Sequence, residues 1–245
     1  MFQPKCQKPT VVNNLYIVAI ISAFLMFFGL LIAPSALAET PTPTPTPTPI
    51  STPSASPAES VDRADSIWVV VNKKRPLNPI KYAPVLDKTL NLAKPAADGY
   101  RKLKDAVGKA KMGTLCLNSG YRSYNTQLAT YNRDVSRYGK KIAENLAAHP
   151  GYSEHQTGLA ADISTTALGC RITNFGSSKT STWIAKNSWQ YGFIVRYPNG
   201  ETATTGYQYE PWHLRFVGVE LATQMHDAGI TVLEKFWNLP AATTY

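Results

Sequence analysis

The stretch GYSEHQTGLAADI, residues 151–163, sets a histidine and an aspartate seven positions apart on either side of a glycine. The whole chain of 245 residues has only four histidines. A chain that runs in, turns near Gly158 and runs back can bring His155 and Asp162 to one point, as two ligands of a single zinc ion require. This spacing alone is weak evidence, because many histidines lie near an aspartate without sharing a metal.

A second cluster, YEPWHLRF, places Glu210 and His213 three positions apart. In a regular strand these two side chains would face opposite sides. The proline between them cannot donate to a sheet ladder, so we expect a bend that turns both toward one cavity. His155, Asp162 and His213 would then be three protein ligands with a fourth position left for water, which is typical of catalytic zinc. Glu210 is the predicted base for that water.

A third segment, NSGYRSYNTQ, carries Arg122 just after a glycine turn and Gln127 five residues later. The planar guanidinium matches a carboxylate, so Arg122 can hold a peptide's free C-terminus or steady an oxyanion. The alternative is an ordinary surface ion pair.

Glu210 and several aromatic and histidine residues also have simpler, non-catalytic interpretations. Glu210 can pair with Arg196 or Arg215 instead of acting as a base. We expect the remaining aromatic and histidine side chains to be packing residues, pocket walls or surface groups: Trp212, Trp189, Tyr191, Phe193, His149 and His226.

The N-terminal 38 residues resemble an export signal. Two lysines and no acid precede a nearly unbroken apolar run at residues 15–33, and Ala36 and Ala38 form the A-x-A pattern that a signal peptidase cleaves. The run is also close to the roughly 20 residues that a membrane span needs. An uncleaved membrane anchor with its basic end inside the cell is therefore the alternative, and either interpretation places the rest of the chain outside the membrane.

Residues 39–60 alternate proline with threonine and serine, which predicts a stiff linker without a core. In polyproline II geometry it would span on the order of 70 Å. The domain is expected at residues 61–245, and without the first 38 residues the formal charge falls from +9 to +7. A basic exported domain is attracted to anionic wall polymers or acidic lipid.

Cysteine use fits an exported domain. With Cys6 in the signal segment, Cys116 and Cys170 would lie outside the cytoplasm, where disulfides persist. The two cysteines form either a disulfide bond or two separate buried thiols.

Hydrophobic spacing in the domain predicts an α+β fold, with a small, mainly antiparallel sheet and helices packed on one side. Strands are expected at residues 66–77, 114–117, 159–164, 192–198 and around 207–216, the last interrupted by proline. Helices are expected from Pro95 to Gly113, from Ser123 to Leu146, at 182–187 and at 217–228. The sequence shows no internal repeat, no phosphate-binding glycine loop and no nucleic-acid motif.

The three segments SGYRSYNTQ, SEHQTGLAADI and YEPWHLRF, in this order, resemble the VanY-type D-alanyl-D-alanine carboxypeptidases, which are zinc peptidases related to lysostaphin and the hedgehog N-terminal domain. The pattern S-x-H-x-x-G-x-A-x-D and the pattern E-x-x-H are both matched in full. The resemblance implies zinc held by His155, Asp162 and His213, and Glu210 as the catalytic base. It also implies that Arg122, Gln127 and Ser153 bind substrate and that Arg122 stabilises the developing negative charge.

The implied reaction is hydrolysis of the bond before the C-terminal D-alanine of a peptidoglycan stem peptide. D,D-carboxypeptidase, L,D-carboxypeptidase and cross-link endopeptidase activities all remain open, since the choice depends on the pocket around Tyr191, Tyr207 and Trp212. A non-catalytic zinc-containing wall-binding module and a structural metalloprotein are the alternatives from other classes, and the presence of Glu210 favours catalysis. We expect an exported monomer, with a biological role in wall maturation or in glycopeptide resistance.

Overall fold

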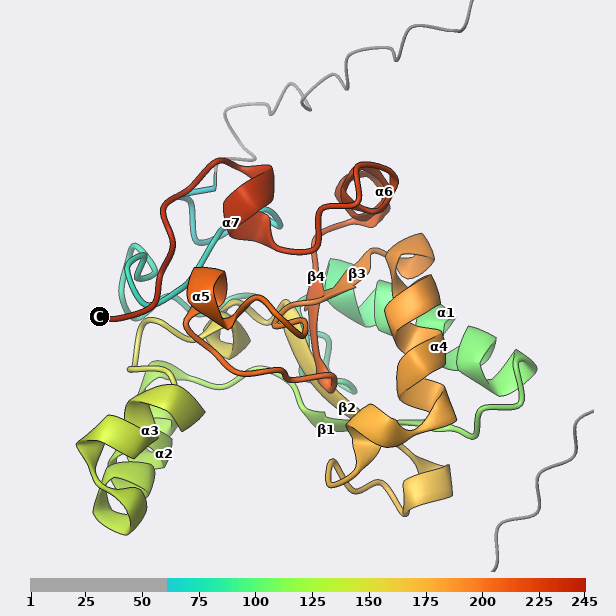
Figure 1. Cartoon of the computed structure of the whole chain (residues 1–245), viewed down its shortest axis with the longest axis horizontal. Coiled ribbons are helices and arrows are strands. Elements are labelled where there is room, and N and C mark those ends of the chain that lie inside the picture. Colours follow the sequence, from blue (N-terminus) through green and yellow to red (C-terminus); the bar gives the residue numbers. More distant parts are fainter. Residues whose placement is uncertain (1–60) are drawn as a thin grey trace, which may run out of the picture. The chain divides into compact units, whose positions relative to one another are not determined.

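The structure, a computed structural model, describes residues 61–245 (Figure 1). The predicted export segment at 1–38 and the linker at 39–60 lie outside the described residues. Within residues 61–245, no helix combines the length and the apolar character needed to cross a membrane.

The centre of the fold is a sheet of four strands in the order β1-β2-β4-β3, and all neighbouring strands are antiparallel. The predicted α+β class with a small antiparallel sheet is therefore confirmed. The strands are β1 (Leu115–Ser119), β2 (Ala160–Thr165), β3 (Phe193–Val195) and β4 (His213–Phe216).

Seven α-helices and four short 3-10 helices are assigned among the described residues. Serine side chains begin two of them: Ser123 accepts the N–H of Thr126 at the start of α2, and Ser178 accepts that of Ser181 at the start of α4. The helices are α1 (Lys94–Lys109), α2 (Tyr124–Tyr138), α3 (Lys140–Leu146), η2 (Glu154–Thr157), η3 (Thr166–Leu168), η4 (Phe175–Ser177), α4 (Lys179–Asn187), η5 (Ser188–Tyr191), α5 (Thr202–Thr205), α6 (Val219–Asp227) and α7 (Leu233–Phe236).

The two faces of the sheet have different roles, because successive strand residues point to opposite sides. One face packs on α1 and forms the main hydrophobic core; its members include Ala161, Ile163, Leu214, Phe216, Tyr100, Leu103 and Val107. Gly99 of α1 allows this close packing, since a Cβ there would lie 2.8 Å from the Phe216 ring. The opposite face carries Asp162, His213 and Arg215, so the polar site lies on the side of the sheet away from α1.

The strand predicted at residues 66–77 is wrong. Its side chains do alternate between two cores, with Val69 and Val71 in one and Trp68 and Val70 in the other. Its backbone, however, belongs to no sheet: the β-bridge found in it is the isolated one between Asn72 and Arg75. The carbonyl of Val69 instead accepts a hydrogen bond from Arg215. A buried arginine therefore takes the place of a neighbouring strand.

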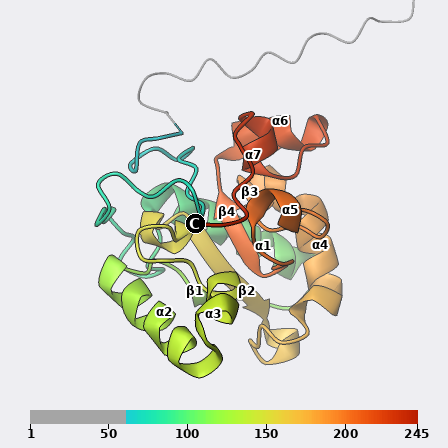
Figure 2. The same cartoon turned by 60° about the vertical axis from the view of Figure 1, so that its left-hand side comes forward.

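The long helix predicted from Ser123 to Leu146 is broken at Gly139, which has a φ of +79°. Its apolar stripe is not a core face, because Leu128, Ile142 and Leu146 are all exposed. In both cartoon views the α2–α3 hairpin lies to one side of the domain, apart from α1, α4 and α6 (Figure 2). The periodicity predicted helical structure in this segment correctly, but neither the break at Gly139 nor the surface that the apolar stripe covers.

Other differences are small. The helix predicted to end at Gly113 ends at Lys109, the one predicted at 182–187 begins at Lys179, and the last predicted helix is α6. The segment before Gly158 was expected to be extended but forms η2. The short helices α5 and α7 were not predicted.

Cys116 of β1 and Cys170 form a disulfide bond across 54 positions of sequence. The bond joins β1 to the loop that follows β2. The Asn118 side chain donates to the carbonyl of Cys170 at 2.7 Å beside it, so this corner of the sheet is fixed twice.

Replacing both Cys116 and Cys170 by alanine should lower the free energy of unfolding by about 2–4 kcal/mol, because the unfolded chain loses a long closed loop. Denaturant unfolding of the purified domain measures this. The matched control is the unsubstituted domain under reducing conditions, which should show a similar loss. Equal stability of the oxidised domain and the double variant would contradict the prediction.

Candidate metal centre

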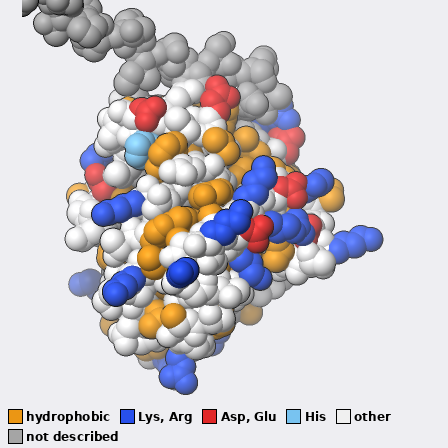
Figure 3. All heavy atoms as spheres, turned by 90° about the vertical axis from the view of Figure 1, so that its right-hand side faces the viewer, with side chains coloured by type: hydrophobic (Ala, Val, Ile, Leu, Met, Phe, Trp, Pro, Cys, Tyr) orange, Lys and Arg blue, Asp and Glu red, His pale blue; other side chains and the backbone are white. Residues whose placement is uncertain are grey.

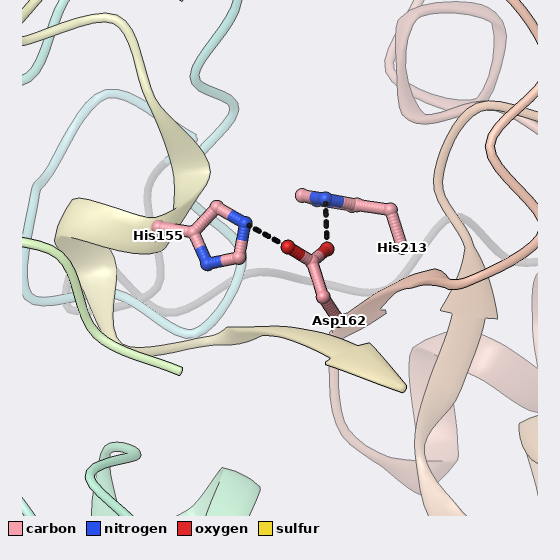
Figure 4. A group of neighbouring side chains, drawn as sticks. All are labelled: His155, Asp162 and His213. Atoms are coloured by element: carbon pink, nitrogen blue, oxygen red, sulfur yellow. Dashed lines mark ion pairs between the residues drawn. The ribbon is translucent and has the colours of Figure 1, made fainter. Parts of the chain in front are cut away.

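His155, Asp162 and His213 meet at one point, although they come from η2, β2 and β4 (Figure 4). One oxygen of Asp162 points toward each imidazole: Oδ2 lies 3.3 Å from His155 Nε2, and Oδ1 lies 3.1 Å from His213 Nδ1. The potential ligand atoms of the three residues all lie within 4.8 Å of one another. The two ring centroids are 5.0 Å apart.

Strand register brings Asp162 and His213 together. The two residues are direct partners in the antiparallel β2–β4 ladder, so their side chains project from the same face of the sheet. His155 is added by the turn at Gly158, whose φ of +70° ends η2 and directs the chain into β2. A side chain at Gly158 would also approach the backbone nitrogen of Ala93 to 2.9 Å, so glycine is required there.

A hydrogen bond to the backbone fixes the orientation of His155. Its Nδ1 lies 2.7 Å from the carbonyl of Gly120, so the ring proton sits on Nδ1 and Nε2 keeps its lone pair. Glycine is required at position 120, because a Cβ there would lie 2.5 Å from the carbonyl of Asn91. The loop is held further by Arg122, whose N–H donates to the carbonyl of His155 at 3.1 Å.

The bend expected in YEPWHLRF is a tight turn. The N–H of His213 donates to the carbonyl of Glu210 at 3.1 Å, and Pro211 occupies the second position, where proline favours such turns. The turn places Glu210 Oε2 at 3.9 Å from His213 Nδ1. Both side chains line the same cleft, as predicted from the sequence.

The three ligand candidates fit a divalent cation. Two donors on one tetrahedral zinc ion, each about 2.0–2.2 Å from it, lie roughly 3.4 Å apart, close to the two distances found here. Within residues 61–245, Asp162 Oδ1, which faces this cluster, is buried without a hydrogen-bond partner. The surroundings also favour positive charge: burial lowers the pKa of His213, but Asp162 and Glu154 outweigh it and raise that pKa to about 9.

Glu210 has the environment of a general base. Burial raises its pKa to about 7, and Asp162 adds to the rise, while His213 and Arg122 oppose it. A carboxylate with this pKa can take up and return a proton near neutral pH. By contrast, burial would raise the pKa of Asp162, but the two imidazoles hold it well below its usual range, so Asp162 stays ionised as a ligand must.

The three predicted substrate-binding residues lie near the centre but have different surroundings. Arg122 and Ser153 line the cleft. Gln127 is fully buried: its Oε1 accepts from Arg122 Nη1 at 2.9 Å, and its Nε2 donates to the carbonyl of Ala148 at 2.7 Å. Ser119 Oγ accepts from the other end of the guanidinium at 3.1 Å, so the orientation of Arg122 is fixed.

The metal centre lies in a cleft of about 410 Å³. One wall is built by the α2–α3 hairpin and the residues after it, including Thr130, Asp134 and Leu146; the other includes Tyr197, Tyr207, Gln208 and Trp212. Tyr191, which we expected near the pocket, packs instead against the main core. The cleft is therefore shared between the hairpin and the segment before β4.

The alternative pairing of Glu210 with Arg196 or Arg215 is wrong. Both arginines are fully buried and bond Glu154, and Arg196 also bonds Glu234. Sequence reasoning missed Glu154, although it lies between Ser153 and His155 in the motif. A charged residue inside the motif was a signal of a buried ion pair, but the sequence could not identify the partners, because they lie in distant segments.

The two other histidines differ from each other. His226 is about half exposed, pairs with Asp227 and stacks on Trp189. His149, expected on the surface, is partly buried, and its ring stacks on Tyr245 at a centroid distance of 3.6 Å. Neither belongs to the metal centre.

The chain is similar to proteins of one peptidase family. The family model described as VanY, D-alanyl-D-alanine carboxypeptidase, matches residues 89–219. The protein YodJ of Bacillus subtilis (strain 168) is 38% identical over 192 residues, which cover 73% of this chain and 70% of YodJ.

Two solved structures show the same fold. The L,D-carboxypeptidase LdcB, described in relation to peptidoglycan recognition, aligns with a TM-score of 0.65 and 37% identity over 71% of this chain and 87% of LdcB. A vancomycin-resistance D,D-pentapeptidase VanY, in complex with Zn(II), aligns with a TM-score of 0.60 and 32% identity over 69% of this chain and 98% of that protein. The family resemblance read from the motifs is thereby confirmed, and the chain belongs to the VanY D-alanyl-D-alanine carboxypeptidase family.

Proposed function

We propose that this protein is a zinc-dependent carboxypeptidase that removes the C-terminal D-alanine from peptidoglycan stem peptides. The observation that carries the proposal is the position of Glu210, a buried carboxylate beside two imidazoles and one further carboxylate, in the same cleft as Arg122. The zinc complex of a relative with the same fold supports the choice of metal.

His155, Asp162 and His213 are the residues that would hold the zinc ion. Two neutral imidazoles and one carboxylate form a donor set typical of catalytic zinc, in which three protein ligands leave one position open. When bound, the ion supplies a Lewis acid for the scissile carbonyl and lowers the pKa of water toward 7.

Glu210 is placed to move the proton. In its ionised form it accepts a proton from the attacking water, and in its protonated form it donates that proton to the nitrogen of the leaving D-alanine. A domain that had lost its catalytic activity would be expected to have lost this base as well. The presence of Glu210 therefore argues against a purely structural zinc domain.

Arg122 supplies fixed positive charge. Its guanidinium is held by Gln127 and Ser119, so it can bind a substrate carboxylate or the developing oxyanion without losing much conformational freedom. Gln127 has both ends of its amide bonded within the protein, which favours an orienting role for it. Ser153, in the cleft, remains the predicted polar contact to substrate.

The order of similarity suggests which substrate to test first. LdcB, an L,D-carboxypeptidase, shares 37% sequence identity with this chain, against 32% for the D,D-pentapeptidase. We therefore take a tetrapeptide stem ending in D-alanine as the first substrate, and a pentapeptide as the second. A cross-linked stem dimer tests the endopeptidase alternative.

We further propose that the domain acts outside the cell membrane as a monomer, exported or anchored through residues 15–33. The export-like N-terminus, the proline-rich spacer and the basic composition support this setting. On the face seen in Figure 3, Lys and Arg side chains are spread over the surface, interspersed with some acids. Such a surface favours weak, salt-sensitive association with anionic wall polymers.

The decisive test is metal content together with product release. Purified domain should contain one zinc ion, release D-alanine from a stem peptide, lose activity with a chelator and regain it with added zinc. Elemental analysis and mass spectrometry of the products measure this. Domain without bound zinc, or zinc-loaded domain that releases no D-alanine from any of the three stem substrates, would contradict the proposal.

Glu210→Gln should retain zinc but lower kcat by at least about a hundredfold, since it removes the general base and leaves the ligands in place. Elemental analysis and the rate of D-alanine release measure the two effects. Glu220→Gln, at an exposed glutamate of α6, is the matched control and should keep full activity. A fully active Glu210→Gln variant would exclude the proposed base.

The pH profile should report the same carboxylate. Only ionised Glu210 can accept a proton, so kcat/KM should fall as the pH drops through its pKa, which is about 7 without a cation. A bound cation favours the carboxylate, so in the zinc enzyme the acid limb should lie below that pH. The residual activity of Glu210→Gln should lack the limb. Zinc content is followed across the same pH range, and an unchanged limb in the variant would contradict the assignment.

A further inference from the structure

Glu154 is a buried carboxylate between two ligand candidates. It follows Ser153 and precedes His155 on η2, and its side chain has no exposed surface. Oε1 accepts from Arg196 Nε at 2.8 Å and from Arg215 Nη1 at 2.7 Å. Oε2 has no hydrogen-bond partner and lies 3.5 Å from His213 Nε2, which also has none.

Both arginines are themselves fixed. Arg196 forms two further hydrogen bonds with Glu234 of α7, at 2.7 and 2.9 Å. Arg215 donates to the carbonyls of Ile67 and Val69, at 3.1 and 2.6 Å. The Glu154 carboxylate therefore cannot rotate freely, and its second oxygen stays directed at His213.

The tautomer of His213 follows from this arrangement. Its Nδ1 faces Asp162 at 3.1 Å and Glu210 at 3.9 Å, so Nδ1 is the nitrogen that points into the ligand cluster. A neutral imidazole that offers the Nδ1 lone pair to a cation carries its proton on Nε2. The nearest acceptor for that proton is Glu154 Oε2.

We propose that Glu154 is a positioning residue: it accepts the Nε2 proton of His213 and so fixes the tautomer and ring orientation with which His213 binds the cation through Nδ1. The proposal rests on the zinc site of the proposed function. It gives a role to the unpartnered Oε2 of Glu154 and to the unpartnered Nε2 of His213, which face each other.

Glu154→Gln tests the role with little change of shape. The amide oxygen would be retained by the two arginines, which leaves an NH₂ group facing His213 Nε2, and two donors cannot bond each other. The His213 proton then moves to Nδ1, where it competes with the cation. Loss of such an outer partner typically weakens metal binding about 10–100-fold, and we expect that range here.

Glu234→Gln is the matched control. Glu234 is also fully buried and bonds the same Arg196, but its carboxylate bonds no ligand candidate. Both variants leave an arginine with less compensating charge and should have a lower Tm in the metal-free protein. Only Glu154→Gln should weaken zinc binding, measured by competition with a chromophoric chelator in the absence of substrate.

The outcomes separate the two proposals. If the unsubstituted domain binds no zinc, the proposed function fails. If it binds zinc and Glu154→Gln binds equally tightly, or if both variants weaken binding in proportion to their loss of Tm, the positioning role is overturned while the proposed function stands.

A second measurement does not depend on a folded variant. In the zinc-loaded, unsubstituted domain with ¹⁵N-labelled histidine, NMR should show His213 protonated at Nε2 and His155 protonated at Nδ1. A His213 ring protonated at Nδ1 in the zinc-loaded domain would overturn the proposal.

Discussion

The pairing of Asp162 with His213 across β2 and β4 is the constraint on which the rest of the site depends. A strand register that slipped by one residue would turn one of these side chains into the main core, because the side-chain period of a strand is two. The apolar neighbours Ala161, Ile163 and Leu214 face α1 and prevent such a slip, since they would have to enter the polar face. The hydrophobic core thus fixes the geometry of the metal centre without touching it.

Buried charge is the second requirement of this fold. Burying a charge is costly unless it is paired and hydrogen-bonded, and the polar face of the sheet holds several carboxylates and arginines in contact. Glu154 and Glu234 compensate Arg196 and Arg215. These bonds join η2, the residue after β3, β4, α7 and the irregular segment near Val69. Glu154 belongs to this network and also faces His213, so folding and assembly of the site are coupled.

The cleft combines a rigid floor with a peripheral wall. Its floor consists of the sheet and η2, whereas the wall formed by α2 and α3 lies to one side of the domain and exposes much of its apolar stripe. Gln127, the only buried residue of α2, connects that wall to Arg122 at the centre. Under the proposed function, variation along the hairpin would change substrate preference while the proposed ligands and base stay in place.

The sequence by itself determined the fold class, the family and the residues that meet at the candidate metal centre. Each motif brings its own turn: Gly158 lies between His155 and Asp162, and Pro211 lies between Glu210 and His213. It wrongly predicted a strand at 66–77, where the backbone bonds an arginine side chain instead of a neighbouring strand. It also did not determine which surface the apolar stripe from Leu128 to Leu146 covers. The disulfide between Cys116 and Cys170 was one of two alternatives. Only the tertiary structure decided that Arg196 and Arg215 pair with Glu154 and not with Glu210. The choice among several oppositely charged partners depends on strand register and burial, and both involve segments far apart in the chain.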